Sequence, residues 1–246
     1  MFSDIELNII AVSAFAAVLA GFVQRVSGFA FGIVFLSILP YILPYGEAVV
    51  ISKMLLLIVS VSTAFIYRKD VNWSMAKIII LSLCVFDFIG IFVLTQIDLS
   101  NFKCYLGLFL ALLGCYALFF KKNFSFHPSH KLSVAFGSIT GFCSGLFGVG
   151  GPFLAMYLSN SNLGKNVYYA TMQCSVFVVM FFDVVMRISH GFATEQALKI
   201  TVLALPCAFI GTMLGTVLFR RLDSVFIGRL VNVIMIINGL NMFFKT

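Results

Sequence analysis

The sequence predicts an all-α integral membrane protein made of two inverted-topology repeats, each containing a glycine-rich interruption of an apolar segment. Of its 246 residues, 61% are hydrophobic and 10% are charged, whereas a soluble domain carries about 25% charged residues. The mean hydropathy is +1.09. Long apolar segments recur along the chain, and two glycine-rich stretches align with each other. We therefore expect lipid to surround most of the protein surface.

The apolar segments set the expected helices. A helix needs about 20 apolar residues to cross a bilayer, and segments near that length lie at 5–24, 46–67, 74–96, 101–120, 131–147, 164–187, 194–219 and 224–244. Two shorter apolar stretches, 30–43 and 150–161, each follow a glycine-rich run. The pattern predicts about eight full transmembrane helices and two short or re-entrant helices.

The distribution of basic residues predicts the orientation. The loops near 68–77, 121–131, 165 and 220–221 fall on one side of the expected helices and hold most of the 16 Lys and Arg residues. Cytoplasmic loops are rich in Lys and Arg. This predicts a multi-pass protein of the cell inner (plasma) membrane with both termini on the outer face. Because the basic residues lie between hydrophobic segments, they do not form a patch typical of nucleic-acid binding.

An internal repeat relates the two halves. A shift of 120 residues aligns AGFVQRVSGFAFG (20–32) with TGFCSGLFGVGGP (140–152), and a shift of 121 places Phe88–Gly90 on Phe209–Gly211. We expect a first repeat at 1–122, a central cytoplasmic linker at 123–130 and a second repeat at 131–246. Each repeat reverses the direction of the chain, so the second copy is inverted. Inverted repeats with broken helices are typical of secondary transporters, whose substrate sites lie at the repeat interface.

The glycines in these stretches have two interpretations. They permit close packing of helices, or they mark points where a helix stops and exposes backbone N–H groups. The stretch GFCSGLFGVGGP is unusually dense in glycine and ends in proline, which favours an interruption. A helix that starts after such a break presents free N–H groups and the positive end of its dipole, a binding site for anions. Two such breaks would contribute to one central site.

Lys53 is the most prominent charge within an expected helix, since it stands inside EAVVISKMLLLI. A charge within a membrane segment is costly and is a candidate for function. Its counterpart in the second repeat is Gln173, so the repeats would offer a cation and an amide to the same cavity. The alternative is that Lys53 extends toward the membrane interface.

Polar residues also occupy the first break. Gln24 and Arg25 stand where the second repeat has Ser144 and Gly145. Arg25 either clamps an oxyanion with two hydrogen bonds or is a cytoplasmic topology charge. Gln24 and Ser144 would supply neutral donors at equivalent places.

Asp87 and Asp183 are acidic residues within expected helices. Asp87 either couples transport to protons, since burial favours the protonated carboxyl group, or is a fixed counter-ion to Lys53 or Arg25. Asp183 and Arg187 are four residues apart near the outer end of one helix and predict a local ion pair.

The paired motifs GFVQRVSGFAFG and GFCSGLFGVGGP resemble those of the TauE/SafE sulfite exporter family, membrane transporters associated with export of sulfite and organosulfonate anions. The resemblance covers the whole chain, and the lysine at position 53 also resembles the family pattern. Pro152 departs from the commoner GVGGG form of the second motif. The resemblance implies anion transport.

We therefore predict a secondary transporter that exports a small sulfur-containing anion by alternating access. The alternatives are a channel or a carrier for another small organic or inorganic anion, and a scaffold without transport activity. We expect no enzyme, because no HExxH or GxSxG pattern occurs, and we expect no cofactor and no metal. The sequence is compatible with a homo-oligomer. The predicted substrate-binding residues are Gln24, Arg25, Gly28, Phe29, Lys53, Ser144, Gly145, Gly148, Val149, Gly150, Gly151 and Gln173, with Asp87 as coupling residue or counter-ion.

Overall fold

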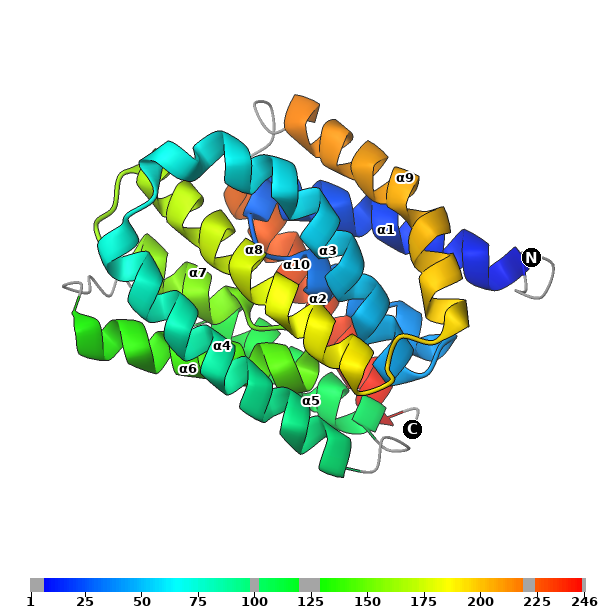
Figure 1. The fold of residues 1–246 in the computed structure, drawn as a ribbon. Coiled ribbons are helices and arrows are strands. Elements are labelled where there is room, and N and C mark those ends of the chain that lie inside the picture. The colour runs from blue at the N-terminus through cyan, green and yellow to red at the C-terminus, as the bar shows by residue number, and fades with distance from the viewer. Residues whose placement is uncertain (1–6, 98–101, 120–128, 219–223, 245–246) are drawn as a thin grey trace. The chain divides into compact units, whose positions relative to one another are not determined.

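The computed structural model describes residues 7–97, 102–119, 129–218 and 224–244. In these ranges the chain is helical and contains no strand (Figure 1). The helices are α1 (Leu7–Ser27), α2 (Phe31–Leu36), η1 (Leu39–Tyr41), α3 (Tyr45–Tyr67), η2 (Arg68–Asp70), α4 (Trp73–Gln96), α5 (Phe102–Phe119), α6 (His130–Phe147), α7 (Gly151–Ser159), α8 (Lys165–Ser189), α9 (Glu195–Leu218) and α10 (Ser224–Phe244).

The helices occur where the apolar segments predict them. The short stretch 30–43 becomes α2 followed by the single 3-10 turn η1, and 150–161 becomes α7. Among the described residues, four helices are long and apolar enough to cross a membrane, namely Leu7–Ser27, Trp73–Gln96, Asn166–Ser189 and Glu195–Val217. The composition and these helices indicate a membrane protein.

The contacts within the chain define two compact units. The first comprises Met1–Leu55, Asp98–Lys122 and Gly191–Thr246, and the second comprises Leu56–Ile97 and Asn123–His190. Each unit therefore contains helices from both predicted repeats, and α3 contributes to both. The predicted linker 123–130 lies largely outside the described residues, and α6 already begins at His130.

In the first unit, glycines bring helix backbones into contact. Gly21 of α1 faces the backbone oxygen of Ala208 in α9, and Gly211 of α9 faces the backbone of Val18. A side-chain carbon at either glycine would collide with that backbone. This is the small-residue packing that membrane helices use at close crossings.

In the second unit, α4 crosses α6 in the same way. Gly90 of α4 faces the carbonyl oxygen of Phe142, while Gly141 and Gly145 of α6 face the backbone of α4. Helix α8 joins this pair, because the backbone N–H of Asn72 donates to Thr171 Oγ1 at 3.0 Å. The packing interpretation is therefore correct for this set of glycines.

Side-chain caps fix where several helices begin. The side-chain oxygens of Asn72, Ser129 and Thr194 accept hydrogen bonds from backbone N–H groups three residues later, at the starts of α4, α6 and α9. Such caps satisfy N–H groups that have no partner inside the helix.

Candidate functional site

Both glycine-rich stretches end a long helix in the same way. Gly28 after α1 has φ 87° and Gly148 after α6 has φ 70°, a left-handed conformation that costs a residue with a Cβ about 1–2 kcal/mol. The N–H of Gly28 donates to Gln24 O at 2.7 Å, and that of Gly148 donates to Ser144 O at 2.9 Å. Both glycines therefore interrupt a helix, as predicted, and a short helix follows each one.

In the first break, the side chain of Gln24 closes the gap between the two helices. Its Oε1 accepts a hydrogen bond from Phe31 N at 3.0 Å, at the start of α2. Its Nε2 donates to Gly28 O at 3.1 Å. The amide predicted to bind a ligand is buried and binds the backbone of the break itself.

Ser27 completes the cap of the first break. Its hydroxyl oxygen accepts hydrogen bonds from Ala30 N at 3.2 Å and from Phe29 N at 3.4 Å, and donates to Val23 O at 2.8 Å. Together, Gln24 and Ser27 satisfy N–H groups at the entrance to α2. The positive end of this short helix is thus occupied by side chains of the protein.

Arg25 extends from the first break toward α9. Its Nε donates to Thr216 Oγ1 at 3.0 Å, and its Cβ lies against Gly215. The side chain is half-buried. The structure thus places Arg25 at the final turns of α9, and its predicted contact with an anion stays a prediction.

The second break has different side chains at the positions that cap the first. Its counterparts of Gln24 and Ser27 are Ser144 and Phe147. The N-cap of α7 is Gly150, which makes no side-chain hydrogen bond, and Gly151 and Pro152 follow it. These residues have no side-chain acceptor. The positive end of α7 is therefore not capped by side chains of its own turn.

Polar groups of α6 lie beside this helix start. Gly150 packs against Thr140 O and Ser144 Cβ so closely that an added Cβ would collide with the backbone of Thr140. Thr140 is 3% exposed, and its Oγ1 has no hydrogen-bond partner among the described residues. A buried hydroxyl without a partner is unfavourable. It offers a donor and an acceptor to a polar ligand.

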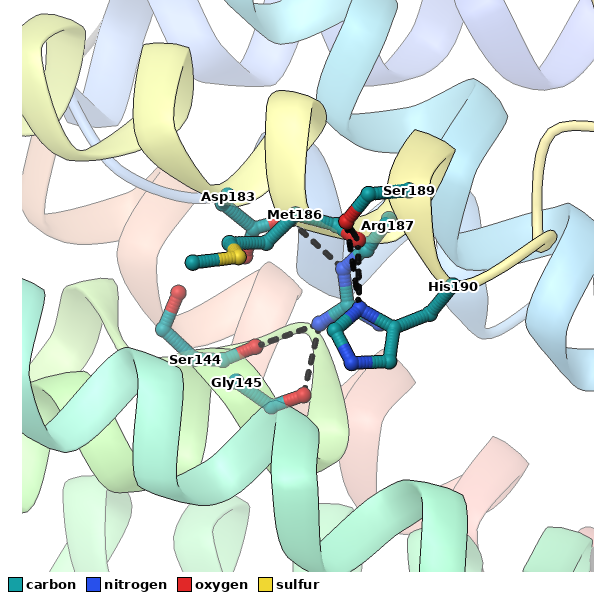
Figure 2. A network of polar contacts seen from close by, with 7 residues as sticks. All are labelled: Ser144, Gly145, Asp183, Met186, Arg187, Ser189 and His190. Carbon is teal, nitrogen blue, oxygen red and sulfur yellow. Dashed lines mark hydrogen bonds and ion pairs between the residues drawn. The ribbon is translucent and has the colours of Figure 1, made fainter.

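Arg187 of α8 reaches the second break through its side-chain hydrogen bonds. It pairs with Asp183 as predicted, Nε to Oδ1 at 2.6 Å, and both side chains are fully buried. Its Nη2 also donates to Gly145 O at 2.6 Å and to Ser144 O at 3.4 Å (Figure 2). The sequence predicted only the ion pair within α8. Whether the Arg187 side chain also reaches α6 depends on how the two helices pack.

The remaining predicted residues are buried. Lys53 and Gln173 are each 2% exposed, so Lys53 lies inside the protein and does not extend outward as its alternative interpretation required. Asp87 is also 2% exposed, and its backbone packs against Gly145. Lys53 belongs to the first unit, and Asp87 and Gln173 belong to the second. That Lys53 and Gln173 share a cavity stays a prediction.

Metal ligands are not gathered in the described part of the chain. No group of three or more His, Cys, Asp or Glu side chains lies there in an arrangement that could hold a metal ion. The chemistry available at the second break is therefore that of hydrogen-bond donors, helix dipoles and a paired guanidinium. These groups favour a negatively charged ligand.

Long apolar helices and two glycine-terminated breaks, each followed by a short helix, indicate a helical membrane protein with interrupted helices. The chain matches the family described as Sulfite exporter TauE/SafE over residues 13–242, nearly its whole length, and it belongs to that family. No curated protein and no solved structure gives a significant match. Membership implies an anion-exporting membrane permease.

Proposed function

We propose that this protein is a secondary transporter that exports sulfite or a related organosulfonate across the inner membrane by alternating access. The observation that carries the proposal is the start of α7, where Gly150, Gly151 and Pro152 carry no side-chain acceptor and the buried Thr140 Oγ1 has no hydrogen-bond partner among the described residues. An anion with three oxygens at one end is a suitable acceptor for backbone N–H groups at a helix N-terminus. Membership of the sulfite exporter family supports the same class of substrate.

The second break supplies mostly neutral groups to this anion. The backbone of Gly148, Val149, Gly150 and Gly151 and the hydroxyl of Thr140 are neutral, and Arg187 is paired with Asp183. Neutral donors bind an oxyanion less tightly than an unpaired cation does. Weak binding suits a transporter, because the substrate must leave after it has crossed.

Lys53 is the proposed cationic contribution, and Gln173 is its proposed neutral counterpart. Lys53 is 2% exposed, and a charge within a membrane segment is a candidate for function. In the first break, the Gln24 side chain and Phe29 N make hydrogen bonds within the break itself. These bonds favour a structural role for Gln24 and Phe29. The proposed contribution of Arg25 and Gly28 to binding is secondary to that of the second break.

The architecture that we propose consists of two inverted repeats with eight full and two short helices and with both termini on the outer face. The alignment places Gly21 on Gly141 and Gly211 on Gly90. Gly21 and Gly211 lie at the close crossing of α1 with α9 in the first unit. Their aligned counterparts, Gly141 and Gly90, lie at the close crossing of α6 with α4 in the second unit. Equivalent contacts at aligned positions support a duplication. A repeated, broken-helix architecture suits alternating access.

Efflux from vesicles tests the proposal. Purified protein is reconstituted into vesicles loaded with labelled sulfite, sulfate, thiosulfate, a sulfonate or acetate. We expect protein-dependent, saturable release of sulfite or the sulfonate, and accelerated exchange when the same anion is present outside. Release without saturation or exchange would instead indicate the channel alternative, and release of acetate alone would indicate a carrier for another class of anion.

A matched pair of lysine variants tests the cation. Lys53→Ala should lower sulfite release by at least about tenfold, because it removes a buried charge from the proposed path. Lys69→Ala, at an exposed position in η2, should leave release unchanged. Equal rates in the two variants would contradict the role of Lys53.

The role of Asp87 is tested by a pH gradient. If Asp87 carries the coupling proton, wild-type release should respond to the gradient and the response of Asp87→Asn should vanish. If the wild type and Asp87→Asn respond equally to the pH gradient, Asp87 has a structural role in helix packing beside Gly145.

A further inference from the structure

Arg187 is a fully buried cation that the sequence motifs do not assign to any function. Both members of the Arg187–Asp183 pair have no exposed side-chain surface. Burying a guanidinium is unfavourable unless it is paired and its remaining donors are hydrogen-bonded. A pair that served α8 alone would need only the bond to Asp183. Arg187 makes further bonds to a different helix.

Those bonds end on the residues that build the second break. Arg187 Nη2 donates to the carbonyl oxygens of Ser144 and Gly145, in the last turn of α6 (Figure 2). Ser144 O also accepts the hydrogen bond from Gly148 N that closes the left-handed turn. Ser144 Cβ lies against Gly150, the N-cap of α7. One residue thus joins the guanidinium, the turn and the start of the short helix.

The carbonyl groups at the end of α6 explain why a cation is placed there. The final carbonyls of a helix lack partners within the helix and form the negative end of its dipole. Arg187 neutralises part of that negative potential close to the start of α7. Asp183 orients the guanidinium by holding its Nε at 2.6 Å, so that Nη2 is directed at α6.

We propose that Arg187, oriented by Asp183, is a positioning residue that holds the second break in its anion-binding shape. This inference rests on the proposed function, because it assigns the second break as the anion site. The guanidinium acts through the carbonyls of Ser144 and Gly145. Its planar fork bonds Asp183 and α6 simultaneously, a geometry that the single ammonium group of lysine does not reproduce.

Glu195 and Lys199 provide a matched control. They form an ion pair with the same spacing of four residues, at 2.8 Å, on α9, but the Glu195 side chain is 80% exposed. Glu195→Gln therefore removes an ion pair of the same type at a solvent-accessible position. Asp183→Asn makes the equivalent isosteric change in the buried pair.

The experiment measures anion affinity and folding separately. For the wild type, Arg187→Lys, Asp183→Asn and Glu195→Gln, sulfite release from vesicles is recorded against sulfite concentration, and melting in detergent is recorded with and without sulfite. We expect Arg187→Lys and Asp183→Asn to raise the half-saturating concentration by at least about tenfold, since small displacements at a site cost this much or more. Both should lose most of the sulfite-induced rise in Tm. Glu195→Gln should behave as wild type.

The possible failures have different signatures. A wild-type half-saturating concentration and a wild-type sulfite-induced rise in Tm in folded Arg187→Lys would overturn the positioning role but leave the proposed function intact. A wild-type protein that neither releases sulfite nor melts later in its presence would overturn both. If Arg187→Lys does not fold, Asp183→Asn decides by the same two measurements. Failure of both variants to give a cooperative melt would assign the pair to folding and overturn the positioning role.

Discussion

The two glycine-rich breaks share a backbone and differ in what occupies the start of the helix that follows. Gly28 and Gly148 each end a long helix in the left-handed conformation, and each N–H bonds to the carbonyl four residues earlier. After the first break, Gln24 and Ser27 bind the N–H groups at the entrance to α2. After the second break, no side chain caps α7 at Gly150.

The difference follows from three aligned positions. Where the first break has the polar pair Gln24 and Ser27, the second has Ser144 and Phe147, and where the first has Ala30, the second has Gly150. A glutamine is long enough to reach the next helix, and a phenylalanine has no acceptor. The first turn is therefore closed by the side chains of Gln24 and Ser27, whereas Gly150, Gly151 and Pro152 carry no side-chain acceptor at the start of α7.

The largest expected effect comes from adding one methyl group to the open break. Gly150→Ala places a Cβ against the backbone oxygen of Thr140, so that the start of α7 must shift. Because displacement of about 1 Å at a site costs roughly a hundredfold in rate, we expect sulfite release from vesicles to fall by about that factor.

The matched control is the aligned position in the capped break. Ala30 already carries a Cβ at the N-cap of α2. Ala30→Gly should leave release nearly unchanged, because the greater flexibility of glycine costs stability, about 0.5–1 kcal/mol, and the first break is not the principal proposed anion site. A larger loss of release in Ala30→Gly than in Gly150→Ala would reverse the comparison and place the anion at the first break.

The shared backbone predicts equal effects at the two left-handed glycines. Gly28→Ala and Gly148→Ala should each destabilise the protein by about 1–2 kcal/mol, because each forces a Cβ into the left-handed region. The free energy of unfolding in detergent measures both. A clear effect in only one variant would show that the two turns are not energetically equivalent.

Removing the cap should weaken the first break alone. Gln24→Ala deletes the acceptor of Phe31 N and the donor to Gly28 O, and loss of a helix cap costs about 1 kcal/mol. We expect a lower Tm with an unchanged half-saturating sulfite concentration. If the affinity for sulfite falls while Tm stays constant, Gln24 binds the anion, as the sequence first suggested.

The smallest effect is expected at Arg25. Arg25→Gln removes the exposed bond to Thr216, a contribution of about 0.5 kcal/mol after allowance for solvent. Release of sulfite should keep its wild-type concentration dependence, measured in the same vesicles. A tenfold loss of affinity would instead establish Arg25 as an oxyanion clamp.

The positions of the helices and of their interruptions could be predicted from the amino-acid sequence alone. Apolar segments predict helices directly, because a helix satisfies its backbone hydrogen bonds within the segment, and this requirement is strict where water is absent. Gly28 and Gly148 could be predicted as breaks since the left-handed turn is a local property that glycine alone adopts cheaply. The pair Asp183–Arg187 was predictable from its spacing on one helix.

The contacts of the polar residues could not be predicted from the sequence, because they depend on how the helices pack. The cap formed by Gln24 depends on the angle at which α2 leaves the turn, and the bonds of Arg187 to Ser144 and Gly145 depend on the packing of α8 beside α6. The grouping of helices from both repeats into each compact unit was equally hidden. These are contacts between residues distant in sequence, whose geometry no local periodicity encodes.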